Sequence, residues 1–363
     1  SLLERIPASL RESIKAIATA GTSGTCLICD DTGAPMSEVL AYDDARATLE
    51  ANRIAELAPA RHITRSATST LAKLLWLIPR VKPGSKYHLV HHADYVGFLL
   101  HGQAGLSDYH NALKLGFDPE SMRYADWMDT LGVTAYLPKV FTSGEPIAAI
   151  NPQVAQRYGF APDCIVCAGT TDSIAAFLAC GANEPGSAVT SLGSTLVLKL
   201  LSERRIDQSD YGIYSHRLGH LWLAGGASNS GGSVLRAFFS DDELERLSAM
   251  IDPEKPSGLD YYPLLRAGER FPHNDPDWPV RLDPRPDDRA AFLHGLLEGM
   301  ARIEAEGYTL LAQLGATPVQ RVYTAGGGAR NGTWRRIRER YLGVPVLVAQ
   351  HSEAAYGAAL LAN

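Results

Sequence analysis

The stretch CIVCAGTTDSIAAFLACG, residues 164–181, gives the first indication of the fold. Its first half is a short apolar run of β-forming residues, and its second half is rich in alanine and other helix formers. The junction at residues 169–172 therefore predicts a buried strand that places the carboxylate of Asp172 at a helix start, where the helix dipole favours negative charge. An acid held there is a candidate proton acceptor or metal ligand. Alternatively, Asp172 is only the N-cap of the helix, a position where Asp is common.

The length and composition of the chain exclude several classes of protein. It has 363 residues, 45% of them hydrophobic, which predicts two domains rather than one. A net charge of -6 without a basic run argues against nucleic acid or an anionic membrane as a partner. No apolar run is long enough for a membrane span, and residues 1–13 carry charges where a signal peptide would be apolar. We expect a cytoplasmic protein, monomeric or homodimeric.

The five cysteines form two C-x-x-C pairs and one single residue, at positions 26, 29, 164, 167 and 180. Two such pairs invite a zinc interpretation. Both pairs, however, lie in apolar runs that read as strands, where residues three apart point to opposite faces. Reduced thiols in the core are therefore the better prediction.

In the first half of the chain, residues 14–21 and 25–33 read as strands on either side of the turn GTSGT, residues 21–25. We expect a β-hairpin or a strand pair. Two glycines and three hydroxyl groups at this turn would let a polyol approach the backbone, although a mere tight turn fits the sequence equally well. Tyr42–Arg46 is expected to open a helix, with acids in its first turn.

Two helical stretches follow over residues 66–78 and 91–102, and then a short polar segment over residues 106–119. His88, His91 and His92 lie just before or at the start of the second stretch and are better explained as surface or capping histidines than as a metal cluster. The polar segment reads as a loop or hairpin. It contains the densest polar group of the first half, Asp108-Tyr109-His110-Asn111, which is either ligand-facing or simply solvated.

The second half restarts with strands after a turn at residues 183–186, which we take as the domain boundary. The turn at residues 192–195 is a fair phosphate cradle built from backbone N–H groups, or an ordinary hairpin turn. Residues 225–233 form a second glycine-rich loop, and residues 287–316 a long amphipathic helix. Residues 320–343 then read as a strand, a triple-glycine turn and a helix. This unit suits a nucleotide that lies against bare backbone.

The sequence has neither a GxxxxGK[ST] P-loop nor a GxGxxG motif after a strand. What remains is a set of glycine and hydroxyl turns in two mixed α/β halves, with one well-placed acid between them. This pattern fits a two-lobed nucleotide clamp.

Several motifs together resemble the FGGY carbohydrate kinases. They are GTSGT with the following YDDAR, AGTTDSIAAFLACG, SLGST, GERFPHNDPDW, and TAGGGARNGTW with the closing EAAYGAALLA, in the family's order and over nearly the whole chain. GTSGT and SDYHNALKLG are most similar to the D-ribulose kinase branch of cyanobacteria and plants, which is related to the xylulose kinases. The resemblance implies an α/β, two-lobed actin-like fold of the ribonuclease H type (ASKHA). It implies a sugar-binding lobe over residues 1–181 and an ATP-binding lobe over residues 182–352, with the helix at 353–363 a candidate to pack back on the first lobe.

The resemblance also implies roles for individual residues in the phosphorylation of a ketopentose by ATP and Mg²⁺. Asp172 matches the general base and a metal contact, Ser23 matches a sugar contact, and Thr22 and Tyr109 are weaker sugar candidates. The remaining matches are Gly193, Ser194 and Thr195 for the turn that meets the phosphates, and Gly327, Gly328, Asn331 and Trp334 for the adenosine pocket. Phosphoryl transfer needs mainly positioning and charge neutralisation, which agrees with this sparse set.

One family feature is absent from the sequence. Family members open with a strand and glycine turn of the form D-x-G-T-x-x-x-R, whereas this chain starts after that point, so we expect its first lobe to lack an N-terminal edge. The alternative function is therefore a catalytically silent sugar- or nucleotide-binding protein. A third possibility, another ATPase of the same fold, is disfavoured by the GTSGT and GERFP segments.

Overall fold

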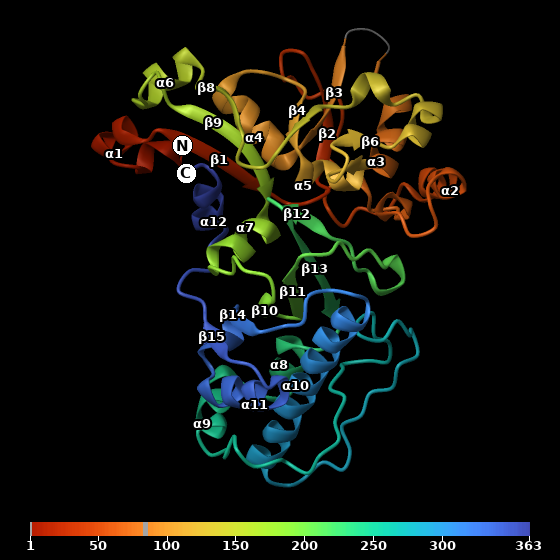
Figure 1. Cartoon of the computed structure of the whole chain (residues 1–363), viewed down its shortest axis with the longest axis vertical. Helices are drawn as coiled ribbons and strands as arrows, with labels where there is room; N and C mark the ends of the chain where they lie inside the picture. The colour runs from red at the N-terminus through yellow and green to blue at the C-terminus, as the bar shows by residue number, and fades with distance from the viewer. Residues whose placement is uncertain (1, 83–85) are drawn as a thin grey trace. The chain divides into compact units, whose positions relative to one another are not determined.

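The computed structural model describes residues 2–82 and 86–363 (Figure 1). The chain divides into two compact units, one made of Ser1–Ala179 with Glu353–Asn363 and the other of Cys180–Ser352. Among the described residues, no helix combines the length and apolarity needed to cross a lipid bilayer.

The first unit contains short sheets surrounded by helices. Its strands are β1 (Ala16–Gly21), β2 (Cys26–Asp30), β3 (Tyr87–His91), β4 (Leu106–Asp108), β5 (Phe117–Asp118), β6 (Arg123–Tyr124), β7 (Lys139–Phe141), β8 (Pro146–Ala149) and β9 (Ile165–Thr171). Its α-helices are α1 (Ala8–Ser13), α2 (Thr48–Leu57), α3 (Thr70–Leu77), α4 (His92–His101), α5 (Tyr109–Ala112), α6 (Pro152–Tyr158), α7 (Asp172–Ala179) and α12 (Ala354–Leu361). Short 3₁₀ turns occur at Leu3–Arg5, Ile63–Arg65, Ile78–Arg80, Leu113–Leu115, Asp126–Leu131 and Thr134–Tyr136.

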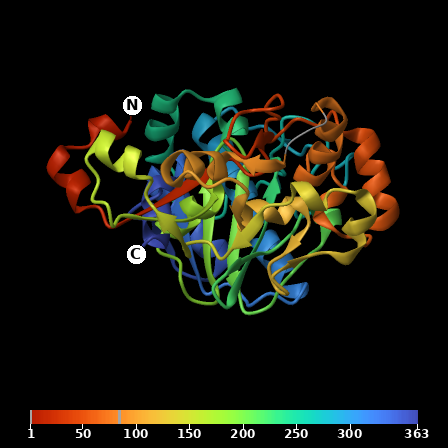
Figure 2. The same cartoon turned by 90° about the horizontal axis from the view of Figure 1, so that it is seen from above.

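The sheet β1-β9-β8 organises this unit (Figure 1; Figure 2 gives the same sheet from above). β1 runs parallel to β9, and β8 is antiparallel to β9. The predicted hairpin between β1 and β2 is wrong, because β2 instead pairs antiparallel with β3. The turn GTSGT thus carries the chain from one sheet to another.

The predicted helix start at Tyr42–Arg46 is also wrong, since α2 begins only at Thr48. The Asp44 carboxylate accepts hydrogen bonds from the backbone N–H of Arg46 (3.1 Å) and from its Nε (3.0 Å). Such local side-chain bonds offer the backbone an alternative to a helix. Asp44 and Arg46 therefore stabilise an ordered loop instead.

The C-terminal helix α12 packs on α7 within this unit. The contact is close because small residues face each other: a Cβ built on Gly357 would lie 1.7 Å from the backbone oxygen of Ala175. Any side chain at position 357 would push the two helices apart. The glycine therefore ties the end of the chain to the helix that begins with Asp172.

The second unit is built on one six-stranded sheet of order β12-β13-β11-β10-β14-β15. Its strands are β10 (Ser187–Leu192), β11 (Leu196–Ser202), β12 (His216–Leu218), β13 (Leu221–Ser228), β14 (Arg321–Ala325) and β15 (Val346–Val348). Its helices are α8 (Gly232–Phe238), α9 (Asp241–Ser248), α10 (Arg289–Gln313) and α11 (Gly332–Leu342), with 3₁₀ turns at Ser209–Tyr211 and Gly327–Arg330. β10 and β11 pair as a hairpin around the predicted turn at residues 192–195, and the predicted long helix is confirmed as α10.

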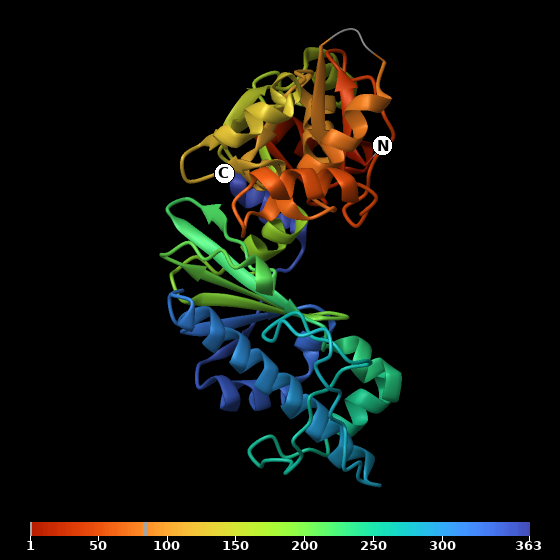
Figure 3. The same cartoon turned by 90° about the vertical axis from the view of Figure 1, so that its right-hand side faces the viewer.

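Helices α10 and α11 cover one face of this sheet and contact each other (Figure 3). A buried ion pair joins them: Arg338 on α11 donates from Nε and Nη2 to the two carboxylate oxygens of Glu304 on α10, at 2.6 and 2.7 Å. Both side chains are at most 1% exposed. The same pair reaches the sheet, because Thr324 on β14 accepts from Arg338 Nη1 and Thr190 on β10 donates to Glu304.

We predict that Glu304→Ala lowers the free energy of unfolding by about 3–5 kcal/mol, because it leaves the Arg338 guanidinium buried without a partner. Equilibrium urea unfolding measures the change. Glu254→Ala is the matched control. Glu254 pairs with Arg336, which lies on α11 as Arg338 does, but the Glu254 and Arg336 side chains are 63% and 54% exposed. That variant should lose at most about 1 kcal/mol. Equal losses in the two variants would contradict the prediction.

Candidate functional site

The parallel pairing of β1 with β9 brings two predicted site segments together. Gly21 at the end of β1 lies opposite Thr171 at the end of β9. Paired strands lie about 4.8 Å apart, so the turn after Gly21 and the Asp172 that follows Thr171 are neighbours at one edge of the sheet. Ligands in α/β folds bind outside the carboxyl ends of such strands.

Asp172 is the first residue of α7 and comes directly after β9, as the sequence predicts. It is the first helical residue and lies in the first turn of α7. Its side chain is half-buried, and none of the described residues donates a hydrogen bond to its carboxylate. A carboxylate that is fixed at its backbone and left without an internal donor is available to a ligand.

The turn GTSGT is more constrained than an ordinary tight turn. Thr22 is held on one side, because its backbone N–H donates to Nδ1 of His92 (3.1 Å) and its Oγ1 lies 2.9 Å from the same nitrogen. Gly24 is held on the other side, because its carbonyl accepts from Lys73 Nζ at 2.8 Å. Between them, the half-exposed Ser23 has no hydrogen-bond partner among the described residues. Its hydroxyl is thus presented by a fixed backbone.

The polar segment after Gly102 is neither solvated nor a simple loop, which corrects the prediction. It forms β4 and the short helix α5, and Asp108, His110 and Asn111 are at most 1% exposed. Asp108 caps α5 by accepting from the backbone N–H groups of His110 (2.9 Å) and Asn111 (3.0 Å). Asn111 Nδ2 also donates to Asp108 at 2.6 Å. The segment folds inward because its polar groups satisfy one another.

His110 connects this buried group to the strand that carries Asp172. Its Nδ1 lies 2.8 Å from Oγ1 of Thr170 on β9 and 2.9 Å from Oγ of Ser143. Ser143 in turn donates to Asp108 at 3.3 Å. The polar density of residues 108–111 is visible in the sequence, but a role for His110 or Asp108 is not. The contact between His110 and Thr170 joins residues 60 positions apart, which no local pattern predicts.

Burial and the nearby Asp94 carboxylate raise the pKa of Asp108 to about 7, against the hydrogen bonds from Asn111 and the charge of His91, which lower it. A second buried pair lies beside it: His91 Nδ1 is 2.7 Å from Asp94 and 3.2 Å from Ser107. His91 also caps α4, as predicted for these histidines, but it is fully buried rather than at the surface.

Tyr109, a predicted sugar contact, is only 3% exposed and packs with Ala112 and Phe117. Its ring also meets His110 edge-on, with centroids 4.6 Å apart. Tyr109 therefore packs in the interior of the first unit next to His110. Its contact with a substrate stays a prediction.

None of the described His, Cys, Asp and Glu side chains gather in threes at metal-ligand distance. The five cysteines are free and buried, as predicted. Burial raises the pKa of Cys26 to about 12, so this thiol stays protonated in the core.

The second unit brings its predicted residues together by the same principle. β10 and β14 are parallel, with Ser191 opposite Ala325, so the turn at 193–195 and the glycine turn at 326–328 leave the same edge of the sheet. A Cβ built on Gly326 would lie 2.8 Å from the backbone oxygen of Leu192, and Gly326 has φ +82°. The two turns are thus in contact, and only glycine fits at position 326.

The turn at Gly193–Thr195 rests against the start of α8. The carbonyl of Gly193 accepts from the N–H of Gly232 (2.9 Å), and that of Ser194 accepts from the N–H of Ser233 (3.0 Å). Arg236 Nη2 donates to Ser194 Oγ at 2.9 Å. These bonds fix the turn while leaving Ser194 exposed.

Glu269, in the irregular segment before α10, fixes the loop that precedes α8. Its buried carboxylate accepts from Ser228 Oγ (2.6 Å), from the backbone N–H of Asn229 (2.7 Å) and from Tyr262 OH (3.1 Å). Burial and this carboxylate raise the pKa of Tyr262, so the phenol remains a donor. The GERFP motif is visible in the sequence, but the hydrogen bonds by which Glu269 holds the loop before α8 are not.

Asn331 and Trp334 support the glycine turn from within the unit. Asn331 caps α11 by accepting from the N–H of Trp334 at 2.9 Å, and its Nδ2 donates to Ser248 at 2.8 Å. Trp334 is 2% exposed, and a Cβ on Gly328 would lie 2.6 Å from its ring. Gly326 and Gly327 are exposed, as are Arg330 and Gly332 in the same region.

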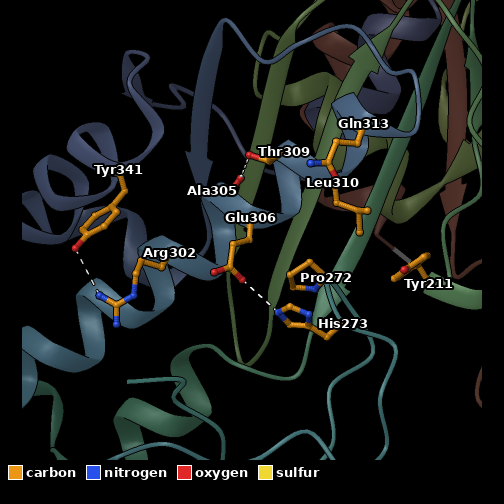
Figure 4. Close-up of a pocket in the computed structure, with 10 residues that line it drawn as sticks. All are labelled: Tyr211, Pro272, His273, Arg302, Ala305, Glu306, Thr309, Leu310, Gln313 and Tyr341. Atoms are coloured by element: carbon orange, nitrogen blue, oxygen red, sulfur yellow. Dashed lines mark hydrogen bonds and ion pairs between the residues drawn. The ribbon is translucent and has the colours of Figure 1, made fainter. Parts of the chain in front are cut away.

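A separate pocket of 560 Å³ lies along α10 (Figure 4). Several of its polar groups already pair with each other: Glu306 lies 3.3 Å from His273, and Arg302 donates to Tyr341 at 3.5 Å. None of the predicted site residues lines it. The pocket is therefore distinct from the two strand edges.

The chain matches known proteins over nearly its whole length. Residues 4–179 match the N-terminal domain and residues 188–363 the C-terminal domain of the FGGY family of carbohydrate kinases. A xylulose kinase of Staphylococcus epidermidis is 24% identical, covering 96% of this chain and 73% of that protein. A gluconokinase of Bacillus licheniformis is also 24% identical, covering 92% and 70%.

Solved structures of related kinases share the fold. The xylulose kinase from Rhodospirillum rubrum superposes with a TM-score of 0.82 at 23% identity, covering 96% of this chain and 75% of that one. The Plasmodium falciparum glycerol kinase with ADP gives 0.82 at 17% identity, covering 96% and 74%. The predicted two-lobed actin-like α/β fold is confirmed.

We predict that the buried carboxyl of Asp108 makes stability pH-dependent. Its folded pKa of about 7 lies above the ordinary 3.8, so across that window the folded state keeps a proton that the unfolded chain has released. Raising the pH through the window should therefore lower the free energy of unfolding of the wild type relative to Asp108→Asn. Urea unfolding at several pH values measures this difference. Parallel curves for wild type and Asp108→Asn would contradict the prediction.

Proposed function

The chain belongs to the FGGY family of carbohydrate kinases, and we propose that it phosphorylates a ketopentose, with D-ribulose preferred and D-xylulose next. Membership makes the protein a phosphotransferase that uses ATP and a small sugar. The xylulose kinases among its relatives support a five-carbon ketose. The preference for D-ribulose rests on the resemblance of the GTSGT and SDYHNALKLG segments to that branch. The observation that carries the proposal is the pairing of Gly21 with Thr171, which places Ser23 and Asp172 at one strand edge.

Asp172 acts in this proposal as the general base. It accepts the proton of the attacking sugar hydroxyl, while the oxygen of that hydroxyl forms the new bond to the γ-phosphorus and the bond to ADP breaks. General base catalysis requires a carboxylate within hydrogen-bond reach of the hydroxyl. The position of Asp172 beside the turn and its freedom from internal donors support this role.

Ser23 and Thr22 are proposed to position the sugar, and Tyr109 is a weaker candidate because its ring is buried. A hydroxyl group on a rigid turn can donate to one sugar oxygen and accept from another. The carboxylate and the hydroxyls thus select a polyol over an apolar ligand.

The second unit is proposed to bind ATP through backbone groups. Gly193, Ser194 and Thr195 would meet the phosphates, and the bare backbone of Gly327 and Gly328 would lie against the adenosine, with Asn331 and Trp334 holding that turn in place. Backbone contacts of this kind need no lysine, which agrees with the missing P-loop motif.

Mg²⁺ is proposed to accompany ATP, and the residues present fit it. The ion prefers oxygen ligands and is commonly bound through one or two carboxylates together with substrate phosphates and water. The Asp172 carboxylate, which accepts no hydrogen bond from the described residues, would supply one such oxygen. When bound, the ion neutralises phosphate charge.

Asp172→Asn should reduce sugar-dependent ADP release by at least about 100-fold, because the amide cannot accept the proton. The assay couples ADP release to D-ribulose, D-xylulose, L-ribulose and glycerol in turn, and calorimetry follows ATP binding. Binding of ATP should change little. Normal turnover by Asp172→Asn would eliminate it as the base, and sugar binding without turnover in the wild type would identify a binding protein instead of a kinase.

Gly327→Ala should raise the KM for ATP by about tenfold without lowering the melting temperature. A Cβ there meets no protein atom within 4 Å, so it would project into space that the nucleotide is proposed to occupy. Gly326→Ala is the comparison, since its Cβ strikes Leu192 and should destabilise the second unit. If a folded Gly327→Ala enzyme kept the KM for ATP of the wild type, the nucleotide would not bind against this turn.

A further inference from the structure

Lys73 on α3 is a fully buried cation with no role in the proposed chemistry. Its exposed fraction is 0%, and its ammonium donates to three backbone carbonyls: Ala41 at 2.6 Å, Gly24 at 2.8 Å and Tyr42 at 3.3 Å. A buried ammonium is costly unless its donors are satisfied. Here all three N–H donors are used, and each fixes a loop rather than a regular element.

The charged and titratable groups that face Lys73 come from three neighbouring elements. They are Cys26 on β2, Asp43 and Asp44 in the loop before α2, and Lys114 after α5. Burial is the main cause that lowers the pKa of Lys73, with Lys114 acting in the same direction and the two acids opposing it. None of these groups replaces the carbonyls as a direct partner of the ammonium.

The turn GTSGT is therefore anchored at both ends of Ser23. On one side, Gly21 lies so close to α4 that a Cβ there would be 2.6 Å from the backbone nitrogen of Ala93. On the same side, the backbone N–H of Thr22 donates to Nδ1 of His92. On the other side, Lys73 Nζ donates directly to the carbonyl of Gly24 at 2.8 Å. Gly24 has φ +82°. A glycine that is not held in place adopts positive and negative φ about equally well, so the bond from Lys73 restricts the backbone here.

We propose that Lys73 is a positioning residue for sugar binding, whose three carbonyl bonds hold the GTSGT turn in the conformation that presents Ser23. The inference rests on the proposed function and deepens it. A loop that is ordered before binding loses less entropy when the ligand arrives, so pre-organisation acts on affinity. The ammonium does not contact the sugar, because Gly24 and the loop at 41–42 enclose it.

The test is the effect of Lys73→Met on each substrate separately. Methionine keeps the length of the apolar stem but donates to none of the carbonyls, so the KM for D-ribulose should rise by about tenfold or more while the KM for ATP changes less than about twofold. Thr70→Val is the matched control. Thr70 is buried one turn earlier on the same helix, its hydroxyl has no partner among the described residues, and its replacement should leave both KM values unchanged.

A second variant and a pH profile keep the inference testable if Lys73→Met does not fold. Lys73→Arg retains a cation and several donors, so it should recover part of the sugar affinity. In the wild type, loss of the ammonium proton at alkaline pH should raise the KM for D-ribulose but not that for ATP. If Lys73 only stabilised the fold, neither its replacement nor alkaline pH would change the KM for D-ribulose relative to the KM for ATP. Equal effects on both substrates, or a flat alkaline profile for the sugar, would overturn the inference.

The inference and the proposed function fail in different ways. If the wild type phosphorylates no ketopentose, or Asp172→Asn is fully active, the proposed function is wrong. If the wild type is active and Asp172→Asn is not, but Lys73→Met binds D-ribulose as tightly as the wild type by calorimetry, only the role of Lys73 is wrong.

Discussion

The parallel alignment of neighbouring strands is the constraint on which the candidate site residues of each unit depend. Parallel strands end at the same edge, so residues far apart in sequence become neighbours wherever two strands pair in this way. β1 and β9 join the GTSGT turn to Asp172 across almost 150 positions of sequence. β10 and β14 join the turn after Leu192 to the glycine turn after Ala325 in the same manner. Each edge thus collects two loops that alone would be ordinary turns.

Buried polar networks hold these edges in place. In the first unit, Asp108, His110 and Thr170 link α5 to the end of β9. In the second, Glu304 and Arg338 link two helices to the strands that carry the glycine turns. Such groups lose hydration when they are buried, and only complete pairing offsets that loss. They are therefore weak sources of net stability but strong determinants of which conformation the loops adopt.

The sequence predicted the second unit and the local elements of the first unit well. Regular alternation and glycine turns are local signals, and they identified β10, β11, α10 and the strand that precedes Asp172. The partner of β1 was missed because pairing depends on contacts between distant segments, which no local pattern encodes. The segment at 106–112 was misjudged for a related reason: its polar residues look solvated until one sees that they bond to each other.

The two edges differ in what they offer a ligand, and the difference follows from their chemistry. The edge in the first unit presents side-chain groups, the hydroxyl of Ser23 and the carboxylate of Asp172, whose positions depend on single bonds such as that from Lys73 to Gly24. Directional side-chain contacts of this kind discriminate between stereoisomers of a polyol, because a misplaced hydroxyl leaves a polar group unpaired. The edge in the second unit presents backbone at Gly193 and Gly327, where the absence of a Cβ sets the fit. Backbone contacts depend little on side-chain identity, whereas the hydroxyl and carboxylate of the first edge make contacts that depend on where a ligand carries its own polar groups.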